Sequence, residues 1–208
     1  MGSTVIDALR VSVNYTSVDW NALDKENPHH WADAVAIVKD RLNGRYLDYS
    51  SQCLESPNSG FIVLSIDCLI IETVQQFREG LVNEEGARHS ARLVKAFLSG
   101  ARFQPYFARQ ARNSFYTDIR CGLLHQAEAR NMWLIRRQQN SMLQEFPGGD
   151  GYIIDIVLFH KALCQSLEDY YGELVDPDYI ELRNKLWRKM DAISNVREQR
   201  GAFLGEIS

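Results

Sequence analysis

The chain has few cysteines, and their spacing excludes the common metal-binding and redox motifs. Its 208 residues contain four cysteines, none in a C-x-x-C pair: Cys53, Cys68, Cys121 and Cys164. A structural zinc site needs thiolate or imidazole ligands clustered at short spacing. We therefore expect no metal and no cofactor, and we interpret the cysteines as free thiols of a reducing compartment.

Hydrophobic runs long enough for a membrane are also missing. The longest apolar stretch, 61–71, is interrupted by Ser65 and Asp67 and is shorter than the roughly 18 to 20 residues of a membrane span. Residues 1–10 lack the basic start and apolar core of a signal peptide. We expect a cytoplasmic protein with no membrane partner.

Charge is distributed unevenly along the chain. The net charge is −4, yet residues 86–139, here called the basic segment, carry ten Lys or Arg against only Asp118 and Glu128. The local charge is therefore +8 there and −12 elsewhere. Because a polyanion responds to local charge, the basic segment favours a nucleic-acid partner. The alternative is a solvated helix face whose charges pair with acidic helices elsewhere.

Apolar periodicity is helical over most of the chain, and Asn27-Pro28 is typical of a helix start. We predict an all-α bundle of five or six helices in one domain, 27–208, preceded by an arm or short strand at 1–26. Gly80 and Gly100 suit the ends of two of the helices. The predicted helices cover 27–54 with a break at Asn43-Gly44, 61–79, 84–99, 106–129, 155–174 and 179–198.

A small β-hairpin is predicted as an insertion at 131–155. Residues 132–137 and 152–155 have strand character, and the turn 147–151 lies between them. This glycine-rich turn is not a phosphate-binding loop, because no Lys-Ser or Lys-Thr pair follows it.

Arg120 and His125 are the best candidates for chemistry. An unperturbed imidazole titrates near pH 6.5 and can move a proton, while a guanidinium stays charged and can bridge two phosphate oxygens. Cleavage of RNA requires both functions. Residues five apart on a helix differ by about 140° in direction. Either Arg120 curls round, or the helix ends before His125, or each residue meets its partner across a two-fold interface.

Cys121 and His125 have i, i+4 spacing, which also permits a Cys–His site. We discount that site because no orienting group is close in sequence. The other histidines have simpler interpretations. His29 and His30 suit a surface or capping position, His89 could face phosphates, and His160 is interpreted as structural.

Two carboxylates in the apolar helix 61–79 are candidate supporting residues. Asp67 shares a face with apolar residues and is the more buried of the two in this interpretation, while Glu72 shares another face with Cys68, Leu69 and Gln76. A buried carboxylate needs a partner, and Arg120 or His125 would suit either of them. Alternatively, Glu72 lies at the helix boundary and pairs with a surface Lys or Arg.

The segment 119–128, Ile-Arg-Cys-Gly-Leu-Leu-His-Gln-Ala-Glu, resembles the R-x4-6-H motif helix of the HEPN family (higher eukaryotes and prokaryotes nucleotide-binding). Residues 61–73 resemble the long first core helix of a group of uncharacterised bacterial HEPN-like proteins. The resemblance spans about 30–195. The family that it points to is all-helical, and the resemblance implies that this chain forms a dimer. Many of them are metal-independent ribonucleases of toxin–antitoxin, phage-defence or RNA-processing systems.

The resemblance implies a homodimeric endoribonuclease that cuts RNA through attack of the 2′-hydroxyl, leaving a 2′,3′-cyclic phosphate. His125 would carry the proton and Arg120 would bind the scissile phosphate, with an antitoxin or regulatory protein as a further partner. Asp67, Glu72 and Cys121 would support the pair. The residues expected to bind RNA are Arg88, Arg92, Lys95, Arg109 and Arg112.

Cys121 departs from the pattern, because catalytic members often carry Asn, Asp or His there. A second hypothesis is therefore a non-catalytic dimer that binds RNA, nucleotide or a partner protein. A third is a different helical enzyme or a structural adaptor. A buried salt bridge of Arg120 with Asp67 and a shielded His125 would favour the third.

Overall fold

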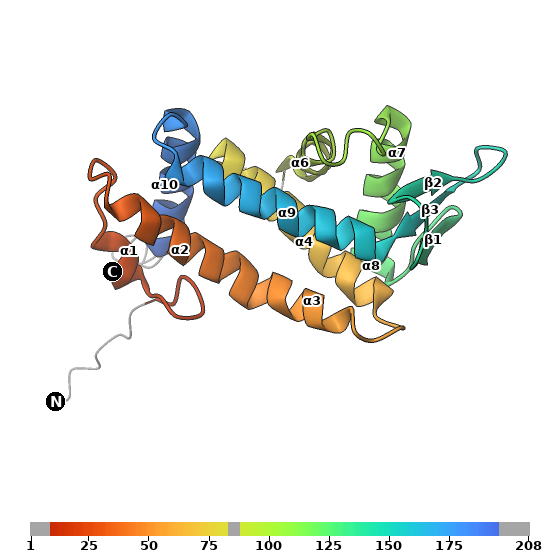
Figure 1. Cartoon of the computed structure of the whole chain (residues 1–208), viewed down its shortest axis with the longest axis horizontal. Coiled ribbons are helices and arrows are strands. Elements are labelled where there is room, and N and C mark those ends of the chain that lie inside the picture. The colour runs from red at the N-terminus through yellow and green to blue at the C-terminus, as the bar shows by residue number, and fades with distance from the viewer. Residues whose placement is uncertain (1–8, 83–87, 196–208) are drawn as a thin grey trace, which may run out of the picture.

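The computed structural model describes residues 9–82 and 88–195. Six helical rods and one short helix make up most of this part of the chain (Figure 1). Parts of the predicted arm and of the predicted helices 84–99 and 179–198 lie outside the described residues. Within them, the prediction of a helical bundle is confirmed.

Two of the rods are continuous helices in which a short π-helical segment joins two α-helical segments. The first consists of α2 (His30–Leu42), η1 (Asn43–Leu47) and α3 (Asp48–Cys53). The second consists of α7 (Arg109–Ser114), η2 (Phe115–Arg120) and α8 (Cys121–Gln126). The predicted break at Asn43-Gly44 is therefore a wider turn of one helix. Single π turns inside α-helices often occur at functional sites, and η2 ends on Arg120.

The remaining helices surround α4 (Gly60–Glu79), which packs against α3, α6 (Ser90–Phe97), α9 (Ile156–Val175) and α10 (Ile180–Ser194). Gly80 has a φ of 67° and ends α4 in the left-handed conformation, as predicted. α4 is the one helix of the described residues that is long and apolar enough to cross a membrane. Its apolar face is instead the centre of the hydrophobic core, with these buried residues: Val63, Leu64, Cys68, Ile70, Ile71, Val74 and Phe77.

The described part of the N-terminal arm begins at residue 9 and lies against α2. Its only strand-like feature in the described part is an isolated bridge between Arg10 and Thr16. Asp40 of α2 accepts hydrogen bonds from Ser12 and Asn14. The short helix α1 (Ser17–Asn21) then buries Trp20 against Trp187 of α10. The described part of the arm thus belongs to the same packed unit as the bundle.

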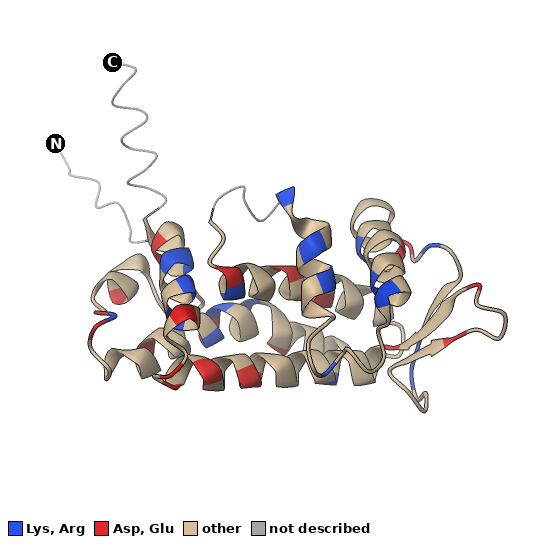
Figure 2. Cartoon of the chain, turned by 90° about the horizontal axis from the view of Figure 1, so that it is seen from above, with Lys and Arg blue, Asp and Glu red and all other residues tan. Residues whose placement is uncertain are grey.

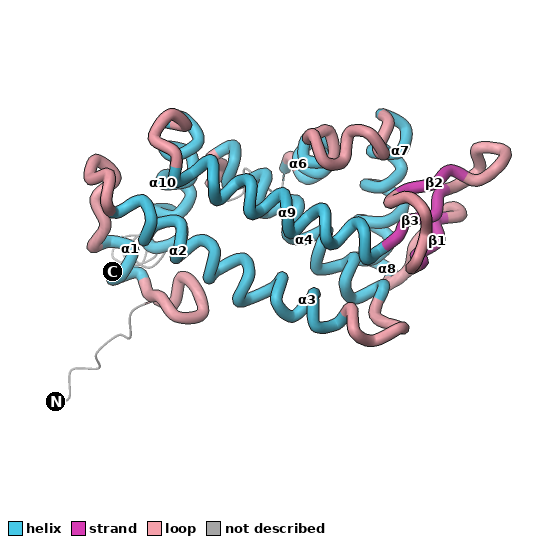
Figure 3. The backbone as a smooth tube through the Cα atoms, in the orientation of Figure 1, coloured by secondary structure: helices cyan, strands magenta, loops and turns pink. Residues whose placement is uncertain are grey.

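The two predicted strands are present, but their pairing as a hairpin is wrong, and a fold with a three-stranded sheet is not all-α. Strands β1 (Trp133–Arg136), β2 (Leu143–Glu145) and β3 (Tyr152–Asp155) form a sheet in the order β1-β3-β2. β3 pairs in parallel with β1 and antiparallel with β2. β2 was missed because three residues show no periodicity. The sheet lies at one end of the bundle (Figure 3).

Asp155 joins this sheet to the start of α9. One of its carboxylate oxygens accepts hydrogen bonds from the backbone N–H groups of Val157 and Leu158, and the other accepts one from that of Gln139. The side chain is almost fully buried. It therefore satisfies donors of the first helical turn and of the loop before β2 together.

We expect Asp155→Ala to lower the free energy of unfolding by about 1–2 kcal/mol, because the helix cap and the loop contact are lost together. Urea unfolding followed by circular dichroism measures this loss. Asp155→Asn, which keeps one acceptor oxygen, is the matched control and should lose less. An unchanged midpoint for Asp155→Ala would contradict the assigned capping role.

Candidate active site and basic groove

Arg120 lies where η2 passes into α8, with its side chain directed at α4. Its Nε and Nη2 donate to Oε2 of Glu72 over 3.1 and 2.7 Å, and the side chains are only 17% and 12% exposed. Ser90 of α6 donates to the same oxygen over 2.9 Å. Glu72 thus ties the motif helix and the start of α6 to the central helix.

The electrostatic setting keeps Arg120 charged. Burial acts to lower the pKa of its guanidinium, but the charge of Glu72 and its hydrogen bonds outweigh burial and raise the pKa above its ordinary value. The guanidinium also lies 5.9 Å from the ring centroid of Tyr116. The site thus provides a fixed, permanent cation.

His125 is exposed in the last turn of α8, which continues to Gln126. The helix therefore does not end before His125, and that explanation of the motif geometry is excluded. Among the contacts of the described residues, none joins His125 to Arg120 or to Cys121, which is half-buried. The condition that would favour the third hypothesis is not met, because Arg120 pairs with Glu72 and His125 is open to solvent.

The end of the motif helix is fixed by the loop that follows it. Three residues of this loop, Ala127, Asn131 and Met132, have positive φ. The backbone packs so closely on Gly122 that an added Cβ would lie 2.3 Å from the carbonyl oxygen of Glu128. The motif accordingly needs glycine at position 122.

Four of the five predicted RNA-binding residues line one groove between α6 and α7. The groove has a volume of about 630 Å³. Figure 2 marks the Lys and Arg positions along the ribbons of both helices in blue. Its lining contains no acidic residue among those described: Ala91, Arg92, Lys95, Ala96, Ser99, Arg109, Arg112 and Asn113. The fifth predicted residue, Arg88, is exposed just before α6.

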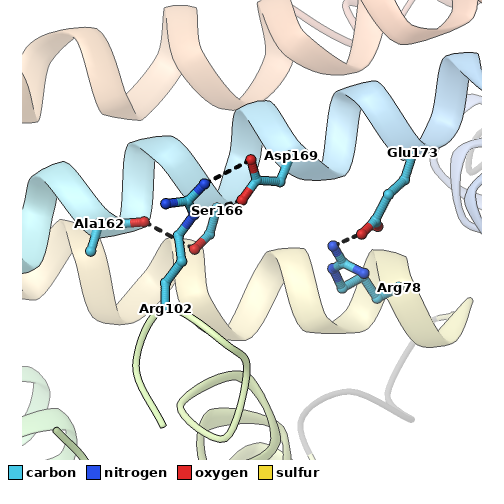
Figure 4. A network of polar contacts seen from close by, with 6 residues as sticks. All are labelled: Arg78, Arg102, Ala162, Ser166, Asp169 and Glu173. Atoms are coloured by element: carbon cyan, nitrogen blue, oxygen red, sulfur yellow. Dashed lines mark hydrogen bonds and ion pairs between the residues drawn. The ribbon is translucent and has the colours of Figure 1, made fainter. Parts of the chain in front are cut away.

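Other charges of the basic segment are paired within the fold. Arg102 donates to both oxygens of Asp169 on α9 over 2.6 and 2.9 Å, beside an ion pair of Arg78 with Glu173 (Figure 4). Arg92 pairs with Glu79 at the edge of the groove. Pairing with acidic helices therefore holds for part of the basic segment only.

The expectation that Asp67 supports Arg120 or His125 is wrong, because Asp67 pairs with another residue. It is fully buried, and its Oδ1 lies 2.8 Å from Nδ1 of His160 on α9. Burial acts to lower the pKa of His160, but the hydrogen bond and the charge of Asp67 outweigh it and raise the pKa to about 10. Sequence reasoning treated His160 as structural and did not single out Ser90. The buried carboxylates indicated that Glu72 and Asp67 have partners, but the sequence did not indicate which residues these partners are.

Comparison with models of protein families, with curated proteins and with solved structures found no match for this chain. By its fold and site, the chain is a largely helical protein with a small sheet, a fixed cation at Arg120 and a basic groove.

We expect Gly122→Ala to destabilise the protein by about 1–3 kcal/mol, because the new methyl group meets the backbone of the following loop. Gly172→Ala is the matched control, since nothing lies within 4 Å of its added Cβ in α9. That substitution should stabilise by about 0.5–1 kcal/mol through helix propensity. Thermal unfolding compares the two, and equal effects would contradict the close approach at Gly122.

The His160–Asp67 pair predicts a pH dependence of stability. Because the pKa of His160 is about 10 in the folded protein and about 6.5 for an ordinary histidine, its contribution is complete below about pH 6.5 and is lost as the pH rises toward 10. The difference in free energy of unfolding between wild type and His160→Gln should shrink over that range. Urea titrations at several pH values measure it, and a constant difference would contradict a protonated pair.

Proposed function

We propose that this protein is a metal-independent endoribonuclease of the HEPN type. In this proposal RNA is cut by attack of its own 2′-hydroxyl, which leaves a 2′,3′-cyclic phosphate and a 5′-hydroxyl. His125 carries the proton and Arg120 stabilises the charge of the phosphorane-like transition state. The observation that carries the proposal is that one helical rod, α7–η2–α8, holds the exposed imidazole of His125 and the fixed guanidinium of Arg120. The same rod forms one wall of the basic groove.

The groove supports RNA as the substrate. Arg109 and Arg112 lie in α7, and the same continuous rod leads to Arg120, a rise of about 12 Å from Arg112 for an ideal helix. Phosphate contacts from Lys and Arg supply affinity without reading sequence. A strand held in the groove could thus extend toward the motif.

A two-fold dimer would resolve the divergence of the motif residues. Arg120 faces Glu72 within its own chain while His125 faces solvent. Apolar side chains remain exposed around this region: Ile62 and Leu69 are 56% and 38% exposed on α4, and Leu124 is 44% exposed on the adjoining α8. Burying them between two copies would gain hydrophobic free energy and bring two motifs together.

The biological setting follows from the resemblance alone. We propose a cytoplasmic protein of a toxin–antitoxin or phage-defence system, with an antitoxin or regulatory protein as a further partner. The second candidate function is a non-catalytic dimer that binds RNA, nucleotide or a partner protein. Cys121 at a usually polar position and the engagement of Arg120 by Glu72 favour that alternative.

The central test is cleavage of a mixed RNA pool in excess EDTA. Wild type should produce cyclic-phosphate ends, and His125→Ala should be slower by about 100-fold or more because a general acid–base group is lost. His29→Ala, which removes another exposed imidazole, is the control and should cut like wild type. Equal cleavage by wild type and His125→Ala would contradict the catalytic role.

Binding through the groove is tested separately with the doubly neutralised variant Lys95→Gln/Arg109→Gln. Its affinity for RNA should fall, and the slope of log affinity against log salt should decrease by roughly one for each lost phosphate contact. Lys161→Gln, which neutralises an exposed lysine of α9, should leave both quantities unchanged. Equal losses in the two proteins would remove the groove from the RNA path. Fluorescence anisotropy with the cleavage-deficient His125→Ala background provides the measurement.

A further inference from the structure

A second group of chemically capable side chains lies apart from Arg120 and His125. Asp67 of α4, His160 of α9 and Ser51 of α3 form a continuous hydrogen-bonded chain. The distance from Asp67 Oδ1 to His160 Nδ1 is 2.8 Å, and that from His160 Nε2 to Ser51 Oγ is also 2.8 Å. This is the order carboxylate, imidazole, hydroxyl in which a serine nucleophile is activated.

Burial gives this chain a direction from the core to the surface. Asp67 is 0% exposed and His160 is 3% exposed, whereas Ser51 lies on the exposed side of α3. α3 and α9 both pack on α4 in this region (Figure 1). The buried pair therefore presents a single nitrogen, Nε2, to a hydroxyl that solvent can reach.

The carboxylate also fixes the imidazole. Oδ2 of Asp67 is buried and has no hydrogen-bond partner among the described residues, and Oδ1 receives only a long contact of 3.4 Å from Ser50 besides that of His160. The carboxylate thus depends on Nδ1–H of His160 as its main donor. With Nδ1 occupied in this way, the hydroxyl of Ser51 meets Nε2, as proton transfer requires.

We propose that Ser51 is a nucleophile that accepts an acyl group from an activated ester. Oγ attacks the acyl carbon and forms a new ester bond while its proton passes to Nε2 of His160. The bond from the acyl carbon to the leaving oxygen then breaks, and Nε2 returns the proton to that oxygen as the alcohol departs. Water repeats the steps on the acyl-serine and releases a carboxylic acid, which restores the hydroxyl of Ser51.

The titratable groups that face His160 are Asp67 from α4 and Cys164 from α9, whose Sγ lies 3.4 Å from Nε2; Ser51 faces it from α3. Because Asp67 raises the pKa of His160 to about 10, the imidazole is mostly protonated at neutral pH. Only the neutral form can take the proton of Ser51. The acylation rate should therefore rise about tenfold per pH unit and level off near pH 10.

The test uses the full chain and p-nitrophenyl acetate at pH 9, with release of nitrophenolate and the position of the acetyl group as readouts. Peptide mass mapping should locate the acetyl group on Ser51. Ser51→Ala, a surface change compatible with folding, should lower acetylation of the protein by at least tenfold. Ser56→Ala, which removes another exposed serine in the loop after α3, should react like wild type.

Acetylation that is equal in Ser51→Ala and wild type would overturn the proposal, and so would an acetyl group found on Cys164 or on lysines instead. His160→Gln should abolish the pH dependence of the reaction. If that variant unfolds, Ser51→Ala and the wild-type pH profile still decide the question. RNA cleavage does not involve this chain of residues, so Ser51→Ala should leave it unchanged.

Discussion

Two carboxylates inside the apolar helix α4 constrain the elements packed around it. A buried carboxylate without a partner is strongly unfavourable, and removing one member of a buried pair typically costs about 3–5 kcal/mol. Glu72 pairs with Arg120 and Ser90, and Asp67 pairs with His160 through Oδ1. These contacts fix the motif helix, α6 and α9 on the same central helix.

The same pairing positions the groups that the proposed ribonuclease would use. Glu72 holds Arg120 in its charged form at the start of α8, while the rest of α8 carries His125 outward to solvent. α6, tied to Glu72 through Ser90, forms one wall of the basic groove, and α7 forms the other. In the proposed ribonuclease, Arg120 therefore has two roles: it pairs with Glu72 in the fold and it binds the phosphate.

Local sequence signals predicted the helices well. The apolar run and Gly80 defined α4, and the concentration of Lys and Arg in the basic segment pointed to Arg92, Lys95, Arg109 and Arg112 as RNA-binding residues. That these four residues line the same groove depends on tertiary packing, which periodicity does not encode. The resemblance at Arg120 and His125 predicted the motif helix but not the burial of Arg120 against Glu72.

The errors came from contacts distant in sequence. The parallel pairing of β1 with β3 places β3 between β1 and the very short β2, and no turn signal distinguishes this order from a hairpin. Asp67 and His160 are 93 residues apart, and although Asp67 stood out as a buried carboxylate, nothing in either helix indicated that His160 is its partner. A carboxylate in an apolar run predicts only that a partner exists.

A double-mutant cycle of Glu72→Gln and Arg120→Gln in RNA cleavage would show whether Glu72 holds Arg120 in place for the reaction. If Glu72 acts by holding Arg120 for the phosphate, each single variant should lose activity, and the double variant should be no slower than Arg120→Gln alone. Losses that multiply in the double variant would contradict the account, because the two residues would then act independently. Full activity in Arg120→Gln would contradict it as well, since the fixed cation would have no part in cleavage.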